Sequence, residues 1–142
     1  MYDVERIGKI ISDIEKYLRD LKELDIKEAK DLADRRNFYA ISMVLFSILN
    51  RTIDLGEEIV MANNLGMPST YKEIFRLLVK NKLIDANLGE GLSNLVFYRN
   101  LLSHEYYELS EKDVFDVSEK INIVKILAER TKELLRMDSP GC

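Results

Sequence analysis

Several residue types are scarce or absent in this chain, and each absence excludes a class of protein. There is one cysteine, Cys142, one histidine, His104, and neither tryptophan nor glutamine. A single cysteine cannot form an intramolecular disulfide, and one cysteine with one histidine supply too few ligands for an ordinary zinc site. We therefore expect no metal and no cofactor.

The length and composition indicate a folded chain with a sizeable core. The chain has 142 residues, of which 46% are hydrophobic, and we expect residues 1–142 to form a single domain. No uninterrupted apolar run reaches the roughly 18 to 20 residues of a membrane span, and the first residues lack the apolar centre of a signal peptide, so we expect a cytoplasmic protein. The net charge of −4 opposes non-specific adhesion to nucleic acid. Any contact with RNA would therefore have to come from a local basic cleft.

Hydrophobic periodicity predicts an all-α fold. Apolar residues recur at three- and four-residue steps, and no stretch alternates as a strand would. The predicted helices cover residues 3–24, residues 29–63 as one helix or as two joined near 34–37, residues 70–81, residues 86–104, and a last helix that begins after Ser110. Short connections between them favour an antiparallel bundle of four or five helices.

Residues 99–106 read RNLLSHEY, and this segment contains the only histidine of the chain. Each residue alone has an ordinary structural interpretation: Arg99 pairs with a carboxylate, His104 caps a helix C-terminus, and Tyr106 packs its ring at the surface. The combination at a fixed short spacing in an otherwise histidine-free chain favours a functional site instead.

This segment resembles the signature of the HEPN superfamily, an Arg and a His separated by four residues, followed after one further residue by a Tyr. The segments LNRTIDLGEEIVMANNLG, GMPSTYKEIFRLL and YRNLLSHEYYELS resemble the HepT-like branch in the same order. Asn100 fits the polar residue that often follows the Arg, whereas Ser103 departs from the usual small aliphatic residue. The resemblance implies a homodimeric ribonuclease toxin with a small nucleotidyltransferase as antitoxin, which could silence the toxin by transferring AMP to Tyr106.

Metal-independent RNA cleavage by attack of the 2′-hydroxyl on the neighbouring phosphate suits these residue types. The reaction needs a base, an acid and a cation that faces the developing negative charge. A histidine titrates near neutral pH, and an arginine holds two phosphate oxygens with its planar fork, which are the catalytic roles we assign to His104 and Arg99. Tyr106 could bind the substrate or accept AMP.

The single histidine adds a mechanistic constraint, because one imidazole cannot easily act as both base and acid. A homodimer would supply two. On an ideal helix Arg99 and His104 lie about 140° apart around the axis, so they share no face unless the helix ends between them or both flank a groove. A two-fold dimer that meets at this end of the helix would gather two copies of each residue around one cleft.

Other charged residues are weaker candidates. Several cations could line a path for RNA, although a solvated helix face is the favoured interpretation, and Arg51 is the best candidate among Arg35, Arg36, Arg51, Arg76, Lys80 and Lys82. Glu57, Glu58, Glu105 and Glu108 match no known metal-ligand spacing. Two alternative functions stay open: a non-catalytic nucleotide- or RNA-binding module that works with a partner nucleotidyltransferase, and a helical dimer with no nucleic-acid role.

Overall fold

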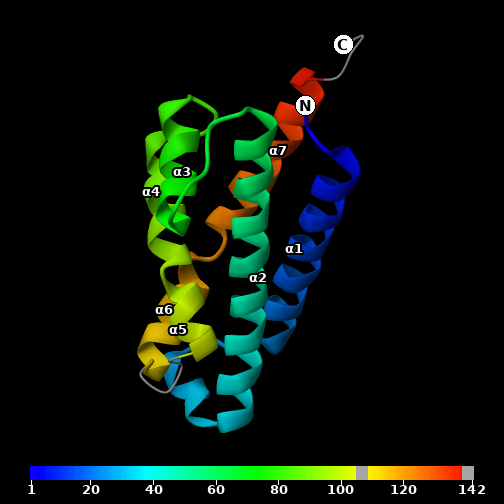
Figure 1. Ribbon diagram of the computed structural model, residues 1–142. Coiled ribbons are helices and arrows are strands. Elements are labelled where there is room, and N and C mark those ends of the chain that lie inside the picture. The colour runs from blue at the N-terminus through cyan, green and yellow to red at the C-terminus, as the bar shows by residue number, and fades with distance from the viewer. Residues whose placement is uncertain (105–108, 139–142) are drawn as a thin grey trace.

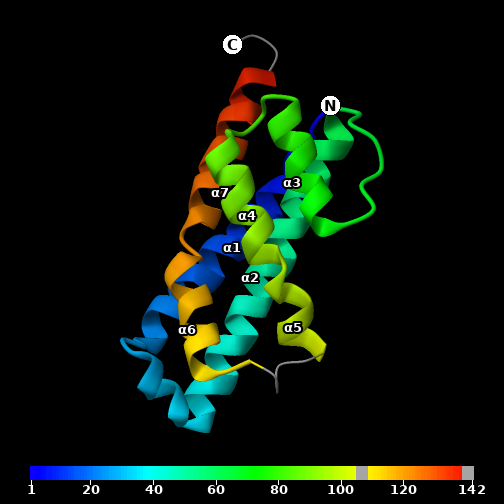
Figure 2. The same cartoon turned by 90° about the vertical axis from the view of Figure 1, so that its left-hand side faces the viewer.

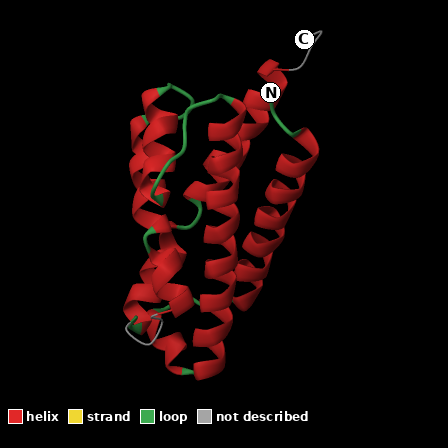
Figure 3. Cartoon of the chain, in the orientation of Figure 1, coloured by secondary structure: helices red, strands yellow, loops and turns green. Residues whose placement is uncertain are grey.

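The computed structural model describes residues 1–104 and 109–138, apart from the side chain of His104. Every regular element in this part of the chain is helical (Figures 1 and 3). In chain order the elements are α1 (Val4–Leu24), the 3₁₀ helix η1 (Ala29–Ala33), α2 (Arg35–Ala62), α3 (Tyr71–Lys80), α4 (Ala86–Val96), α5 (Tyr98–His104), α6 (Glu111–Lys120) and α7 (Ile123–Asp138). The predicted all-α class is confirmed.

Helix α1 has the boundaries that the periodicity predicted. Ile7, Ile11 and Ile14 are buried on one stripe, and Asp3 caps the helix by accepting a hydrogen bond from the Arg6 amide at 3.1 Å. This stripe packs along α2, which runs antiparallel to α1 after a connection that contains η1.

The stretch from residue 29 to residue 63 adopts the two-helix alternative. Asp34 ends η1 and caps α2, where its carboxylate accepts a hydrogen bond from the Arg36 amide at 2.9 Å. Helix α2 then lies at the centre of the bundle, in contact with α1, α3, α5 and α6 (Figure 1). By length and composition α2 could cross a membrane, although charged residues such as Arg51 and Asp54 interrupt its apolar sequence; buried core helices have the same composition.

Helix α3 runs in the same direction as α2, because residues 63–70 return alongside the bundle before α3 begins (Figures 1 and 2). The other successive segments of the bundle are antiparallel. Thr70 caps α3, accepting a hydrogen bond from the Glu73 amide at 3.1 Å. The Glu73 carboxylate turns back to Ser69 instead of to Thr70. The returning loop thus brings the first residues of α3 close to the motif.

Two glycines let α3 pack closely on its neighbours. A Cβ at Gly56 of α2 would lie 2.7 Å from the Ile74 side chain, and a Cβ at Gly89 of α4 would overlap Val79. Any larger residue at either position would push α3 outward.

The two long C-terminal helices that we predicted are each interrupted. Residues 86–104 divide at Phe97 into α4 and α5, and the last helix divides at residues 121–122 into α6 and α7 (Figure 2). The two halves differ in their main partners. Helix α4 packs mostly on α3 and α7 and touches α2, whereas α5 packs on α2. Helix α6 contacts η1 and α2, whereas α7 contacts α4 and α1. If α4 is counted with α5 and α6 with α7, the described α-helices form the five segments of a bundle.

Candidate functional site

Helix α5 carries the first half of the motif to α2. The interruption at Phe97 lets α5 leave the line of α4 and lie against the middle of α2. Arg99 and His104 both belong to α5, and His104 is its last residue. The His104 side chain, Glu105, Tyr106 and Glu108 lie outside the described residues, so their assignments stay predictions.

The Arg99 guanidinium is held by neutral oxygens. Its Nε donates to Oδ1 of Asn50 at 2.7 Å, and its Nη1 donates to Oδ1 of Asn100 at 2.9 Å. A guanidinium has five N–H donors, and these two bonds to described residues leave three of them, all on the two terminal nitrogens.

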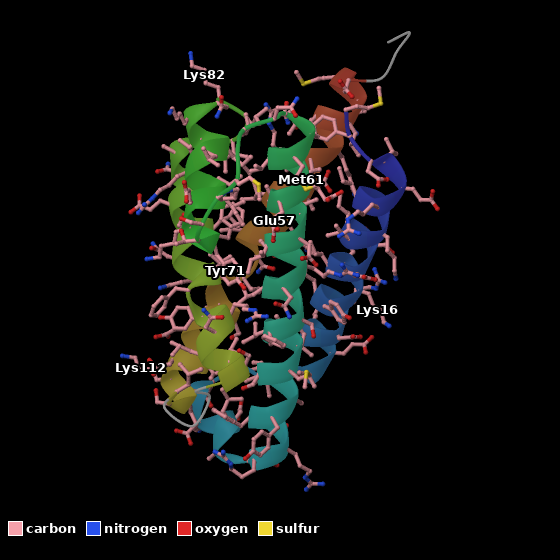
Figure 4. All side chains as sticks on the ribbon, in the orientation of Figure 1. Lys16, Glu57, Met61, Tyr71, Lys82 and Lys112 are labelled. Atoms are coloured by element: carbon pink, nitrogen blue, oxygen red, sulfur yellow. The ribbon has the colours of Figure 1, made fainter. Side chains whose placement is uncertain are left out.

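Two aromatic rings flank the same guanidinium. Its central carbon lies 5.3 Å from the ring centroid of Phe46 and 5.8 Å from that of Tyr71. Both contacts are within the range of cation–π attraction, which holds a cation without cancelling its charge. Figure 4 shows Tyr71 at the lower end of α3, beside α2. We call Arg99, Asn50, Asn100, Phe46 and Tyr71 the arginine cage.

The charge of Arg99 is not neutralised by any carboxylate in the part of the chain that the structure describes. No described Asp or Glu lies within the 4.0 Å of an ion pair with it, which removes the ordinary carboxylate-paired interpretation over those residues. A cation whose partners are neutral, and whose terminal N–H groups remain available, is suited to binding an anion.

Arg51 has the opposite environment. Its Nη2 lies 2.8 Å from Oδ2 of Asp13 on α1, and its Nη1 lies 3.1 Å from Oδ2 of Asp54. The hydrogen bond from Lys9 lowers the pKa of the Asp13 carboxyl below its ordinary value, and the hydrogen bond from Arg51 lowers it further. The structure therefore brings Asn50 to Arg99 and directs Arg51 toward α1.

A cavity of about 430 Å³ with mostly acidic side chains lies near the N-terminus, between the start of α1 and the second half of α2. Burial, followed by the charges of Asp54 and Glu58, raises the pKa of the Glu57 carboxyl. Glu58 is 7% exposed and pairs with Arg6 at 3.3 Å. Over the described residues, no three histidine, cysteine or acidic side chains are grouped as metal ligands are.

A family model described as ribonuclease HepT-like matches residues 7–133. The chain belongs to this family. Among curated proteins, the mRNA nuclease HepT of Shewanella oneidensis strain MR-1 is 36% identical to this chain over 58 residues, which are 41% of this chain and 44% of that protein. The matched part thus spans less than half of that relative.

Two solved structures share the fold of this HepT-like chain. YutE of Bacillus subtilis, a cytosolic protein of unknown function, is 19% identical with a TM-score of 0.84, over 100% of this chain and 98% of YutE. The HEPN toxin of Shewanella oneidensis, solved tri-AMPylated in complex with an MNT antitoxin, is 23% identical with a TM-score of 0.83, over 94% and 99%. Such low identities establish the fold alone.

Sequence reasoning missed three members of the arginine cage of this HepT-like chain: Phe46, Asn50 and Tyr71. A weak signal existed for two of them. Asn50 is a poor helix former inside an apolar helix, and Phe46 lies four residues before it, on the same face. Nothing local indicated that this face meets residue 99.

Proposed function

We propose that this HepT-like chain is a metal-independent endoribonuclease that acts as a homodimer in the cytoplasm, as the toxin of a pair with a nucleotidyltransferase antitoxin. The observation that carries the proposal is the Arg99 guanidinium, held by two amide oxygens and two rings with its charge uncompensated by described carboxylates. This cation lies within the motif, five residues before the only histidine.

In the proposed reaction the 2′-oxygen of RNA attacks the adjacent phosphorus while the bond to the 5′-oxygen breaks. One His104 imidazole takes the 2′-hydroxyl proton, and His104 of the partner subunit gives a proton to the departing 5′-oxygen. The terminal nitrogens of Arg99 hold the phosphate oxygens as negative charge builds up on them. The products are a 2′,3′-cyclic phosphate and a 5′-hydroxyl.

An exposed apolar surface beside the cage supports dimerisation. Tyr39 is 52% exposed and Met43 is 64% exposed, and on α2 they lie on the same side as Phe46 and Asn50. Burial of these side chains against a second copy would place the two arginine cages near one shared cleft, where a two-fold axis brings like residues together.

We further propose that AMP transfer to Tyr106 switches the enzyme off. The Tyr106 hydroxyl would attack the α-phosphate of ATP on the antitoxin, with pyrophosphate as the leaving group. The added phosphate diester carries a negative charge that would occupy the anion site of Arg99. The tri-AMPylated state of the Shewanella toxin supports this regulation.

Incubation of the purified protein with RNA in the presence of EDTA tests the enzymatic proposal. We expect cleavage with 2′,3′-cyclic phosphate ends, lost in His104→Ala and kept in Lys112→Ala, an exposed cation on α6. Sedimentation at micromolar concentration should show a dimer. Binding of RNA without cleavage would instead support a non-catalytic module, and an active monomer would contradict the shared cleft.

Co-expression with the antitoxin tests the regulatory step. The wild-type chain should gain the mass of one or more AMP groups, while Tyr106→Phe should gain none and should keep its cleavage activity in the presence of the antitoxin. Modification of Tyr106→Phe at another residue would show that a different side chain is the acceptor.

A further inference from the structure

Helix α3 carries a row of exposed cations. Lys72, Arg76 and Lys80 are spaced four residues apart, so they follow one side of the helix. All three line a groove of about 510 Å³ between α3 and α4. We call them the α3 basic row. Within the described residues, none of the three forms an ion pair with a carboxylate.

The row is locally basic in a chain that is acidic as a whole. Residues 71–82 contain these three cations, Lys82 and a single carboxylate, Glu73, whereas the chain has a net charge of −4. The Glu73 carboxylate accepts hydrogen bonds from the Ser69 amide and hydroxyl at 2.8 Å, and so faces the loop before α3. Glu90 is the one acidic side chain among the groove residues. Positive charge therefore dominates this side of α3.

The row begins at the arginine cage. Tyr71, a member of the cage, directly precedes Lys72. The Lys72 ammonium lies 5.6 Å from the ring centroid of Phe97, two residues before Arg99. An anionic chain bound at Arg99 would reach Lys72 next.

We propose that the groove between α3 and α4 binds the phosphate backbone of single-stranded RNA on one side of the cleaved bond. The proposal rests on the ribonuclease function proposed above. Four residues of helix rise about 6 Å, so the row spans about 12 Å and can contact two or three successive phosphates. Contacts of this kind bind RNA without reading its sequence, and they give affinity to a protein whose overall charge opposes binding.

The composition of the surface favours a polyanion over a protein partner. None of the exposed large hydrophobic residues among those described lies on α3. Protein interfaces usually have an apolar centre, whereas nucleic-acid interfaces are polar and rich in cations.

The test compares two triple variants in a His104→Ala background, in which RNA stays intact. K72Q/R76Q/K80Q removes the row. K16Q/R19Q/K22Q removes two lysines and one arginine from the exposed side of α1, where they likewise form no ion pair with a described carboxylate and where Figure 4 shows Lys16 on the other side of α2. Fluorescence anisotropy with a labelled 12-nucleotide RNA measures Kd between 50 and 300 mM salt.

We expect the row variant to weaken binding about 10- to 100-fold at 0.1 M salt and to reduce the slope of log K against log salt by about 1.5 to 2, as expected for two or three lost phosphate contacts. The α1 variant should stay within about twofold of its parent. Equal weakening of both variants, no weakening of the row variant, or no RNA binding by the parent would each overturn the proposal.

Cleavage assays separate this proposal from the ribonuclease proposal. With His104 intact, the row variant should cleave a dinucleotide, which has only the scissile phosphate, at the wild-type rate, and should cleave long RNA more slowly at limiting concentration. A wild-type protein that binds RNA through the row and cleaves nothing would refute the ribonuclease function alone. A row variant that binds RNA normally but no longer co-purifies with the antitoxin would make the row a protein interface and refute the proposed RNA groove.

Discussion

Two arginines of this protein, Arg51 and Arg99, lie at two sides of the same helix and have opposite surroundings. Arg51 is paired with two carboxylates, Asp13 and Asp54, and fastens α1 to α2. Arg99 is held by the amide oxygens of Asn50 and Asn100. Both guanidiniums are held by hydrogen bonds, but among the described residues only Arg51 has carboxylates that offset its charge. The charge of the partners, and not the number of hydrogen bonds, distinguishes a structural arginine from one available to a ligand.

The largest effect that separates the two arginines should come from removing the Arg99 cation. We expect Arg99→Gln to lower kcat/KM for RNA about 100- to 1,000-fold, because the phosphate loses its charged donor in the transition state. Its thermal unfolding should change little, since Arg99 pairs with no described carboxylate. Loss of activity accompanied by a large drop in Tm would make Arg99 a structural residue like Arg51.

A second variant should give Arg99 a carboxylate partner, as Arg51 has. Asn50→Asp places a carboxylate 2.7 Å from the Arg99 Nε without changing the size of the side chain. We expect a stable ion pair that lowers RNA cleavage about 10- to 100-fold, since the anion site is already neutralised. Asn122→Asp adds the same charge at an exposed turn between α6 and α7 and should keep its activity. Equal activity of both variants would mean that the charge of Arg99 does not bind substrate.

The sequence predicted the parts of this structure that depend on local patterns. The predicted ranges 3–24 and 70–81 agree with α1 and α3 to within one residue at each end, because apolar periodicity shows which face of a helix is buried. The motif likewise indicated Arg99 as a candidate site residue from a spacing within one segment.

The parts that depend on distant contacts could not be predicted. Helix α2 is apolar nearly all round, so its pattern does not tell which side meets α1 and which meets α5. For this reason the sequence favours the cation Arg51 as an RNA contact and gives no indication that its neighbour Asn50 meets a residue 49 positions away. The interruption at Phe97 was missed for the same reason, since it follows from the packing of α5 on α2.

The smallest effect concerns the stability that Arg51 supplies and its dependence on pH. We expect Arg51→Gln to lower the free energy of unfolding by about 1–2 kcal/mol at pH 7, because Asp13 and Asp54 lose their shared partner in a half-buried setting. The pKa of Asp13 is lowered in the folded state, so its contribution is complete above its unfolded pKa of about 3.9 and is lost as the pH falls through the folded value. The difference in unfolding free energy between wild type and variant should therefore be constant from pH 7 to 5 and shrink below pH 4.

Urea unfolding at several pH values measures this difference, with Lys22→Gln as the control that should differ little from wild type at any pH. A difference that persists unchanged at pH 3 would show that Arg51 stabilises the fold by packing and not by its charge.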